Sequence, residues 1–222
     1  MQEIVQGRII DAWNSGKVLI EASLPNLDKM ASRKYKRVLI AFQDGRRISP
    51  EQRRKAYALI GDIADWTGER PEETKAIMKL EFKLSRIEDI AEKTFSLASV
   101  DMTTARDFIT FLIDFMLEND IPASAPLYEV AEDISKYVYA CLMSKKCCIC
   151  GRPADLHHCE GSRIGAGSDR NQVHHLGRTV IPLCRKHHTE AHNQPEAEYF
   201  EKYHIAGINA DKAICKAYNL KA

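Results

Sequence analysis

The first 156 residues of this 222-residue chain contain no histidine, and the first 146 contain one cysteine. All eight histidines and six of the seven cysteines follow these stretches. The chain also lacks any apolar run near the roughly 20 residues that span a bilayer, and its start lacks the basic and apolar regions of a signal peptide. We therefore expect a cytoplasmic protein without membrane contact, in which clustered cysteine and histidine bind metal rather than form disulfides.

The chain has little net charge, only +1, but its charges are segregated. Residues 29–55 carry a net +8, residues 56–144 a net −9 and residues 145–222 a net +4. Two basic stretches around an acidic middle favour contact with phosphates at two places. A basic stretch is equally compatible with a solvated surface that binds nothing.

Short alternating segments at the N-terminus predict β-structure. Residues 1–24 alternate apolar and polar side chains on both sides of Asn14-Ser15-Gly16, which is typical of a β-hairpin. Residues 37–42 predict a third strand, which Asp44-Gly45 would end.

Four helices are expected between residues 49 and 144. Ser49-Pro50 supplies an N-cap and a first helical residue for the first helix, and Gly68 ends it. The second begins near Pro71, the third follows Asp101, and the fourth covers about 127–144. The apolar stripes of all four are expected in the core. In chain order these stripes are Tyr57, Ile60, Ile63, Ala64 and Trp66; Ile77, Leu80 and Leu84; Phe108, Phe111, Leu112, Phe115 and Met116; and Leu127, Val130, Ile134, Val138 and Cys141.

Two pairs of soft ligands predict a structural zinc site. Cys147 and Cys150 are separated by two residues and followed by Gly151, which allows a tight turn that presents both thiolates to one ion. Cys184 and His187 supply a second pair at the start of a helix. Four such ligands close a tetrahedral site, and an ion without an open position is structural. The alternative is chance clustering of buried thiols. Cys148 lies one residue off register and is the candidate spare thiol, and Cys159 is also left over.

A second group of histidines predicts a site with open positions. His188 and His192 are four residues apart on a helix and face the same way. His157 on a strand supplies a third nitrogen, and three ligands leave positions for phosphate and water. The side chain of His158 points to the other face of that strand, where it could take a proton from the attacking water. The alternatives are a second structural ion or an inactive, DNA-binding relic.

Residues 145–193 with these motifs resemble the HNH, or ββα-metal, endonucleases. The resemblance implies hydrolysis of DNA phosphodiesters with one divalent ion (Mg²⁺, Mn²⁺, Ni²⁺ or Zn²⁺) held by His157, His188 and His192, beside a structural Zn²⁺. It makes His158 the general base. One residue departs from the pattern, because Thr179 stands where these enzymes usually have an asparagine that orients the base. Thr179 or Asn171 is expected to take over that role.

The glycine-rich segment 160–178 joins the two expected strands and offers guanidinium groups to phosphates. Its arginines are Arg163, Arg170 and Arg178. The pair His174-His175 in the same segment could be further DNA contacts or simply loop surface, and surface is the favoured interpretation.

The run from Gly45 to Asp62 resembles the phage lambda Orf (NinB) recombination-mediator family, in which a similar Arg-x-Ser-x-x-Gln-Arg pattern follows a strand. The C-terminal arrangement is similar to HNH nucleases of Gram-positive phages. Together these resemblances imply a homodimer that binds single-stranded or branched DNA beside a single-strand binding protein and a strand-annealing recombinase. The candidate DNA contacts are Arg46, Arg47, Arg53 and Arg54; an alternative is that they only solvate a helix face.

The expected fold is therefore α+β. Residues 1–144 form a mixed domain of sheet and helices, and residues 145–222 form a zinc-bound ββα domain with short helices at 196–203 and 209–218, the second capped by Asn209. The expected function is a metal-dependent HNH endonuclease fused to a recombination-mediator domain, acting in phage recombination or replication in the host cytoplasm. The alternative is a non-catalytic mediator whose HNH domain is a zinc-held DNA clamp.

Overall fold

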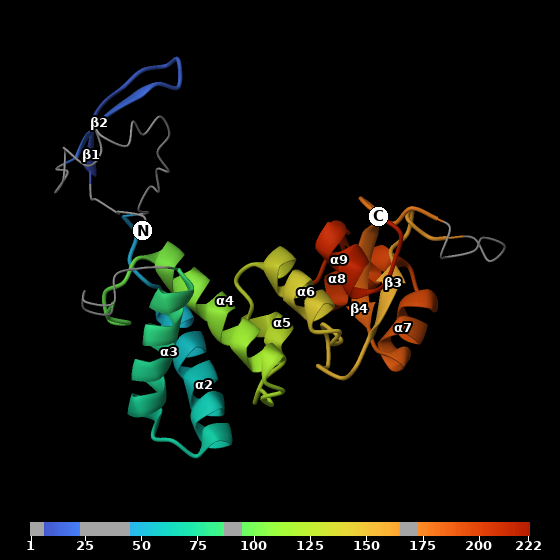
Figure 1. The fold of residues 1–222 in the computed structure, drawn as a ribbon. Coiled ribbons are helices and arrows are strands. Elements are labelled where there is room, and N and C mark those ends of the chain that lie inside the picture. Colours follow the sequence, from blue (N-terminus) through green and yellow to red (C-terminus); the bar gives the residue numbers. More distant parts are fainter. Residues whose placement is uncertain (1–6, 23–44, 87–94, 165–172) are drawn as a thin grey trace. The chain divides into compact units, whose positions relative to one another are not determined.

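The computed structural model describes residues 7–22, 45–86, 95–164 and 173–222 (Figure 1). The chain divides into two compact units, residues 1–43 and 44–222. The strand expected at 37–42 lies outside the described residues, as do Arg170 and Asn171. The boundary expected near residue 144 stays a prediction.

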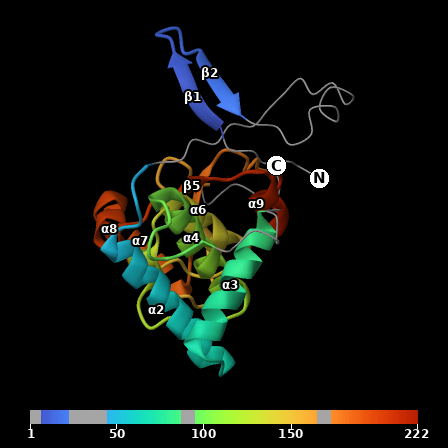
Figure 2. The same ribbon diagram turned by 90° about the vertical axis from the view of Figure 1, so that its left-hand side faces the viewer.

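The first unit contains the expected hairpin. Strands β1 (Gly7–Ala12) and β2 (Val18–Ala22) pair antiparallel with Gly7 opposite Ala22 (Figure 2). Gly16 in the connecting turn has a φ of 79°, in the left-handed region that glycine adopts without strain. The predicted hairpin and its turn are confirmed.

Helix α2 (Pro50–Thr67) begins and ends as the sequence predicts. The Ser49 hydroxyl accepts from the Gln52 amide while the Gln52 side chain accepts from the Ser49 amide, which forms a capping box. Gly68 ends the helix in the left-handed conformation. Helices α3 (Pro71–Ser85) and α4 (Met102–Glu118) both pack on α2, and α4 is capped by Asp101.

The predicted buried face of α3 is wrong. Ile77, Leu80 and Leu84 are 47%, 39% and 43% exposed, while Met78 and Phe82 enter the core. Two lysines beside them are buried along their aliphatic stems, and the Lys79 ammonium donates to the Phe95 carbonyl at 2.9 Å. Because the aliphatic stems of lysines can pack against apolar neighbours, the pattern of polar and apolar residues does not identify the buried face of this helix. On α2, two aromatic residues of the predicted stripe are also exposed, namely Tyr57 (44%) and Trp66 (52%).

The predicted stripe of α4 is confirmed, with Phe108, Leu112 and Met116 completely buried. The helix expected over 127–144 is instead two, α5 (Leu127–Val130) and α6 (Ile134–Met143). The chain is extended at Ala131, and Asp133 starts a new helix by accepting from the Lys136 amide. Glu132 at the break binds Lys55 and Gln52 of α2, which ties the break to the first helix.

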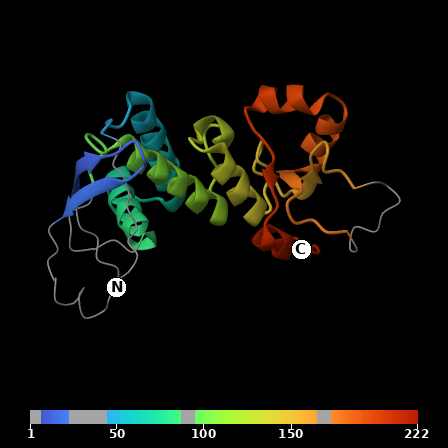
Figure 3. The ribbon, with the colours of Figure 1, turned by 90° about the horizontal axis from the view of Figure 1, so that it is seen from above.

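The C-terminal part contains a three-stranded antiparallel sheet in the order β3 (Asp155–His158), β4 (Thr179–Leu183) and β5 (Ile208–Asn209). Helix α7 (Arg185–His192) follows β4, α8 (Glu196–Tyr203) follows α7, and α9 (Lys212–Ala217) follows β5. The chain reaches this sheet from α4 through α6, which packs on β4, β5 and α9 (Figure 3). The α+β class is thus confirmed.

The helix expected at 196–203 is confirmed, but the one expected at 209–218 begins later. Asn209 lies in β5, and Asp211 caps α9 by accepting from the Ile214 amide at 2.8 Å. None of the helices in the described ranges is both long and apolar enough to cross a membrane.

Candidate metal centre

Three predicted cysteines and one histidine meet at the start of α7. Gly151, with a φ of 67°, closes the turn that carries Cys147 and Cys150, and Cys184 is the residue before α7. The ligand atoms of Cys147, Cys150, Cys184 and His187 all lie within 4.8 Å of one another. The Cys150 and Cys184 sulfurs are 3.6 Å apart. A tetrahedral zinc with bonds of about 2.3 Å separates two sulfurs by about 3.8 Å, so this set, called the thiolate cluster below, has the size that zinc requires.

Arg152 lies against the thiolate cluster, and the sequence reasoning did not single it out. Its Nε donates to the Cys150 sulfur at 3.3 Å and its Nη2 to the Cys184 sulfur at 3.7 Å. Burial opposes ionisation of the Cys150 thiol, but the Arg152 hydrogen bonds outweigh it and hold the pKa of this thiol below its usual value. Burial raises the pKa of the Cys147 thiol to about 12. A cation beside three thiolates offsets their charge.

The two cysteines that the sequence analysis left over are both buried. Cys148 is completely buried and its backbone carbonyl accepts from the Tyr137 hydroxyl of α6 at 2.7 Å. Cys159 is also buried, and a Cβ placed on Gly207 would approach its sulfur to 2.5 Å. Glycine at 207 therefore lets the backbone just before β5 pass close to the Cys159 and Thr179 side chains.

The second cluster lies between β3 and α7, and we call it the imidazole cluster. The rings of His157, His188 and His192 are mutually edge-on, with centroids 4.7 to 5.0 Å apart. Their ligand nitrogens lie within 4.8 Å of one another. His157 is buried, His188 is half-buried and His192 is exposed, so this cluster is reachable from solvent on one side.

The imidazole cluster fits a divalent ion. The His157 Nε2 is buried and has no hydrogen-bond partner in the described part of the chain, and the nearest Glu196 oxygen is 3.7 Å away. A buried, unpaired nitrogen is costly unless something binds it. Burial, followed by the charges of His188 and His192, lowers the pKa of His157 to about 4. The ring is therefore neutral at physiological pH, the form that binds metal.

Glu196 supports this arrangement from the start of α8. It is 9% exposed, and both of its carboxylate oxygens accept from the Glu160 amide, at 2.9 and 2.8 Å. Glu196 thus fastens the chain just after β3, next to His157. The sequence offers no spacing that would have marked it.

His158 points away from the imidazole cluster and pairs with another histidine. Its Nε2 lies 3.0 Å from the Nδ1 of His175, and His175 is completely buried. The prediction that His175 lies at the surface is wrong, since the side chain fills the space beside β3. His174 is exposed as expected, with its Nδ1 2.7 Å from the Ala222 carbonyl oxygen.

Thr179 begins β4 and contacts the neighbouring strand. Its hydroxyl bonds the Asn209 side chain at 3.3 Å, and its amide donates to the Ser162 hydroxyl at 2.9 Å. Arg178 donates to the Ser162 and His174 carbonyls, so this side chain pins the loop. Arg163 is exposed.

The four candidate arginines of the N-terminal part differ in their surroundings. Arg46, Arg47 and Arg54 are exposed. Arg53 is half-buried and donates to the Ala98 carbonyl at 2.9 Å. Gln52 beside it is buried and donates to the Met102 carbonyl, so part of this motif serves the helix start and the packing on α4.

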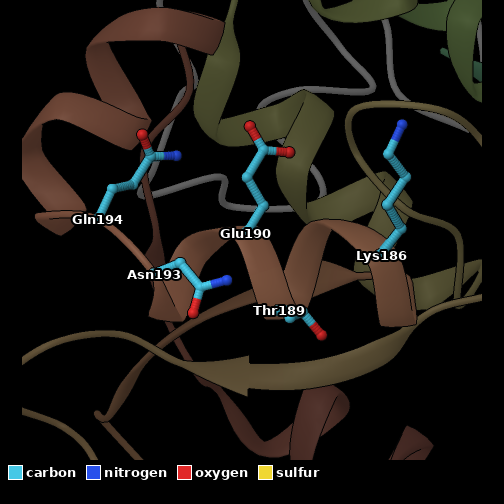
Figure 4. A pocket seen from close by; sticks show the side chains of 5 residues that line it. All are labelled: Lys186, Thr189, Glu190, Asn193 and Gln194. Atoms are coloured by element: carbon cyan, nitrogen blue, oxygen red, sulfur yellow. The ribbon is translucent and has the colours of Figure 1, made fainter.

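A hollow on the outside of α7 is lined by residues of that helix and the turn after it, namely Lys186, Thr189, Glu190, Asn193 and Gln194 (Figure 4). These positions recur at helical spacing on the face opposite His188 and His192. Glu190 there binds Lys202 at 2.7 Å and the Tyr203 hydroxyl at 3.0 Å. The hollow is thus separate from the imidazole cluster.

Two antiparallel strands followed by a helix, with thiolate and imidazole clusters on that helix, define a ββα-metal module. The family model described as "Putative HNHc nuclease" matches residues 19–221, and the chain belongs to this family. Neither the curated proteins nor the solved structures gave a match.

Proposed function

We propose that this protein is a metal-dependent HNH endonuclease that hydrolyses DNA phosphodiesters. The observation that carries the proposal is the imidazole cluster, which is open to solvent on one side and has His158 on the opposite face of the same strand. Membership of the HNHc nuclease family supports it. The thiolate cluster would hold a structural zinc, and the imidazole cluster would hold the exchangeable divalent ion.

When bound, the divalent ion supplies charge stabilisation of the phosphate and of the leaving oxygen. His157, His188 and His192 would hold this ion, and the low pKa of His157 keeps that ring in the neutral form that binds metal. His158 accepts a proton from water, and the water oxygen forms a bond to phosphorus. The bond to the 3′ oxygen breaks and its electron pair leaves with that oxygen. Arg163, which is exposed, and Arg170 are the candidate phosphate contacts of the loop, and Thr179 and Asn171 are the candidates for orienting the base.

The N-terminal part would deliver the DNA. Arg46, Arg47 and Arg54 are exposed, which supports contact with a phosphate backbone; the half-buried Arg53 would contribute less. We extend the proposal to a recombination-mediator domain over residues 1–144 that binds single-stranded or branched DNA. It would act as a homodimer in phage recombination or replication in the host cytoplasm, beside a single-strand binding protein and a strand-annealing recombinase.

A second function, a non-catalytic DNA clamp, is favoured by Thr179. Its hydroxyl bonds the Asn209 side chain. Thr179 is therefore already engaged and does not obviously replace the asparagine that orients the base in the family pattern. Cleavage separates the two functions, because a clamp binds DNA without cutting it.

The test is nicking of supercoiled plasmid with Mg²⁺, Mn²⁺, Ni²⁺ or Zn²⁺, together with metal content per chain. We expect one tightly bound zinc, one exchangeable ion, and activity that falls about 10²- to 10⁴-fold in His158→Ala. If the wild type and His158→Ala bind DNA and are equally inactive with every metal, the protein is a clamp and the nuclease proposal fails.

A further inference from the structure

We propose that His175 is the positioning residue of the general base, in place of the asparagine that HNH enzymes usually have at the position of Thr179. The inference rests on the proposed nuclease function and adds a residue to it. It begins from the 3.0 Å contact between His158 Nε2 and His175 Nδ1, with ring centroids 5.1 Å apart. The two rings are 9% and 0% exposed, so water does not compete for this hydrogen bond.

Two backbone hydrogen bonds fix the main chain of His175. The His175 amide donates to the Lys221 carbonyl at 2.9 Å, and its carbonyl accepts from the Arg178 amide at 3.0 Å. In the same turn, Gly177 has a φ of 78° and its amide donates to the Ala210 carbonyl at 2.8 Å. Residues that follow β5 therefore fix the turn that contains His175 and leads into β4.

This contact engages one nitrogen of His158, Nε2. For His158 to accept the proton of water through its other nitrogen, Nδ1 must carry a lone pair. That requires the tautomer in which His158 Nε2–H donates and His175 Nδ1 accepts. When His158 takes the proton from water, the same Nε2–H becomes the donor of a cation, and its hydrogen bond to His175 strengthens.

The geometry favours His175 over Thr179 for this role. The Thr179 hydroxyl bonds Asn209 on β5, whereas His175 is in direct contact with the base. An asparagine at 175 would place an amide oxygen close to the position of the imidazole Nδ1 and could accept the same hydrogen bond. The family's asparagine function would thus have moved along the chain to a residue that precedes β4.

The experiment compares His175→Ala, His175→Asn and the exposed neighbour variant His174→Ala in the zinc-loaded protein. We expect kcat for nicking to fall about 10- to 100-fold in His175→Ala, as for other residues that orient a ligand or base. KM and metal content should be unchanged. His175→Asn should recover most of the loss, and His174→Ala should match the wild type. Equal kcat in wild type and His175→Ala overturns the proposal, as does equal loss in the alanine and asparagine variants.

A second readout is independent of activity. Long-range ¹H–¹⁵N correlation spectra identify which nitrogen of each imidazole carries hydrogen. We expect His158 as the Nε2–H tautomer in the wild type and in His175→Asn, and a mixture of tautomers in His175→Ala. A bare Nε2 on His158 in the wild type overturns the inference even if the enzyme cuts DNA. The expected tautomer in a protein that cuts nothing instead overturns the nuclease proposal and leaves the hydrogen bond established.

Discussion

The thiolate and imidazole clusters share helix α7 but differ in burial, charge and openness. His187 faces the first cluster and His188, the next residue, faces the second. Four ligands that lie mostly buried suit an ion that never exchanges, whereas three ligands that grade from buried to exposed suit an ion that meets a substrate. Two faces of the same helical turn therefore serve two different sites. One site is buried and suits a structural ion, and the other is open to solvent and suits an ion that meets a substrate.

The largest expected effect comes from breaking the thiolate cluster. Cys184→Ser should abolish tight zinc binding and unfold the β3-β4-α7 region, because the binding energy of a structural zinc, about 10 kcal/mol or more, becomes folding energy. Zinc content by mass spectrometry and circular dichroism measure it. Cys148→Ala, at the neighbouring cysteine outside the cluster, is the control and should keep its zinc. A folded, zinc-loaded Cys184→Ser would remove the distinction between the clusters.

Breaking the imidazole cluster should abolish activity but leave the fold and the structural zinc intact. We expect His188→Ala to lose the exchangeable ion and at least the 10²- to 10⁴-fold of activity attributed to a general base, while it retains one zinc and its melting temperature. Thr189→Ala on the outer face of α7 is the control. Loss of both metals in His188→Ala would mean that the clusters fold as one site.

A smaller effect is expected at Arg152, which donates to two sulfurs of the thiolate cluster. Arg152→Ala should lower zinc affinity about 10- to 100-fold, the usual range for a residue that supports metal ligands. Competition with a chromogenic chelator measures the affinity, and Lys212→Ala removes an exposed charge elsewhere as a control. Unchanged affinity would show that the guanidinium does not stabilise the thiolates.

The smallest effect concerns protons. The pKa of Cys147 is raised to about 12, so at pH 7 this thiol must lose a proton when zinc binds. The pKa of His157 is lowered to about 4, so this ring is already neutral at pH 7 and releases no proton when it binds an ion. Zinc affinity should therefore rise with pH through the neutral range, while His157 adds no such dependence at the other cluster. Titration calorimetry in buffers of different ionisation enthalpy should find at least one proton released at the thiolate cluster, and a value of zero there would contradict the assignment.

The clustering of the candidate metal ligands could be predicted from the sequence because their geometry is local. Two intervening residues between Cys147 and Cys150, and one helical turn between His188 and His192, bring the side chains together whatever the rest of the fold does. The capping box at Ser49 is local in the same sense, because it joins residues three apart in the sequence. In each case the spacing in the sequence alone determines which side chains meet.

What escaped prediction depends on contacts between distant segments. His175 lies 17 residues from its partner His158, and only the pairing of β3 with β4 brings the two together. The break between α5 and α6 depends on Glu132 binding Lys55 of α2. On α3, the buried face depends on where Lys79 finds a carbonyl acceptor. Neither propensity nor spacing contains this information.

The hydrogen bond from the Tyr137 hydroxyl to the Cys148 carbonyl affects where this module could be fused to other proteins. A fragment that started at Cys147, the first residue of the thiolate cluster, would leave that carbonyl without its donor and would remove α6 from the sheet against which it packs. Because α6 also packs on α4, and residues 44–222 form one compact unit, a junction directly ahead of α6 would expose a second packed face. A chimera should therefore keep the helices that precede the two clusters as well as the clusters themselves.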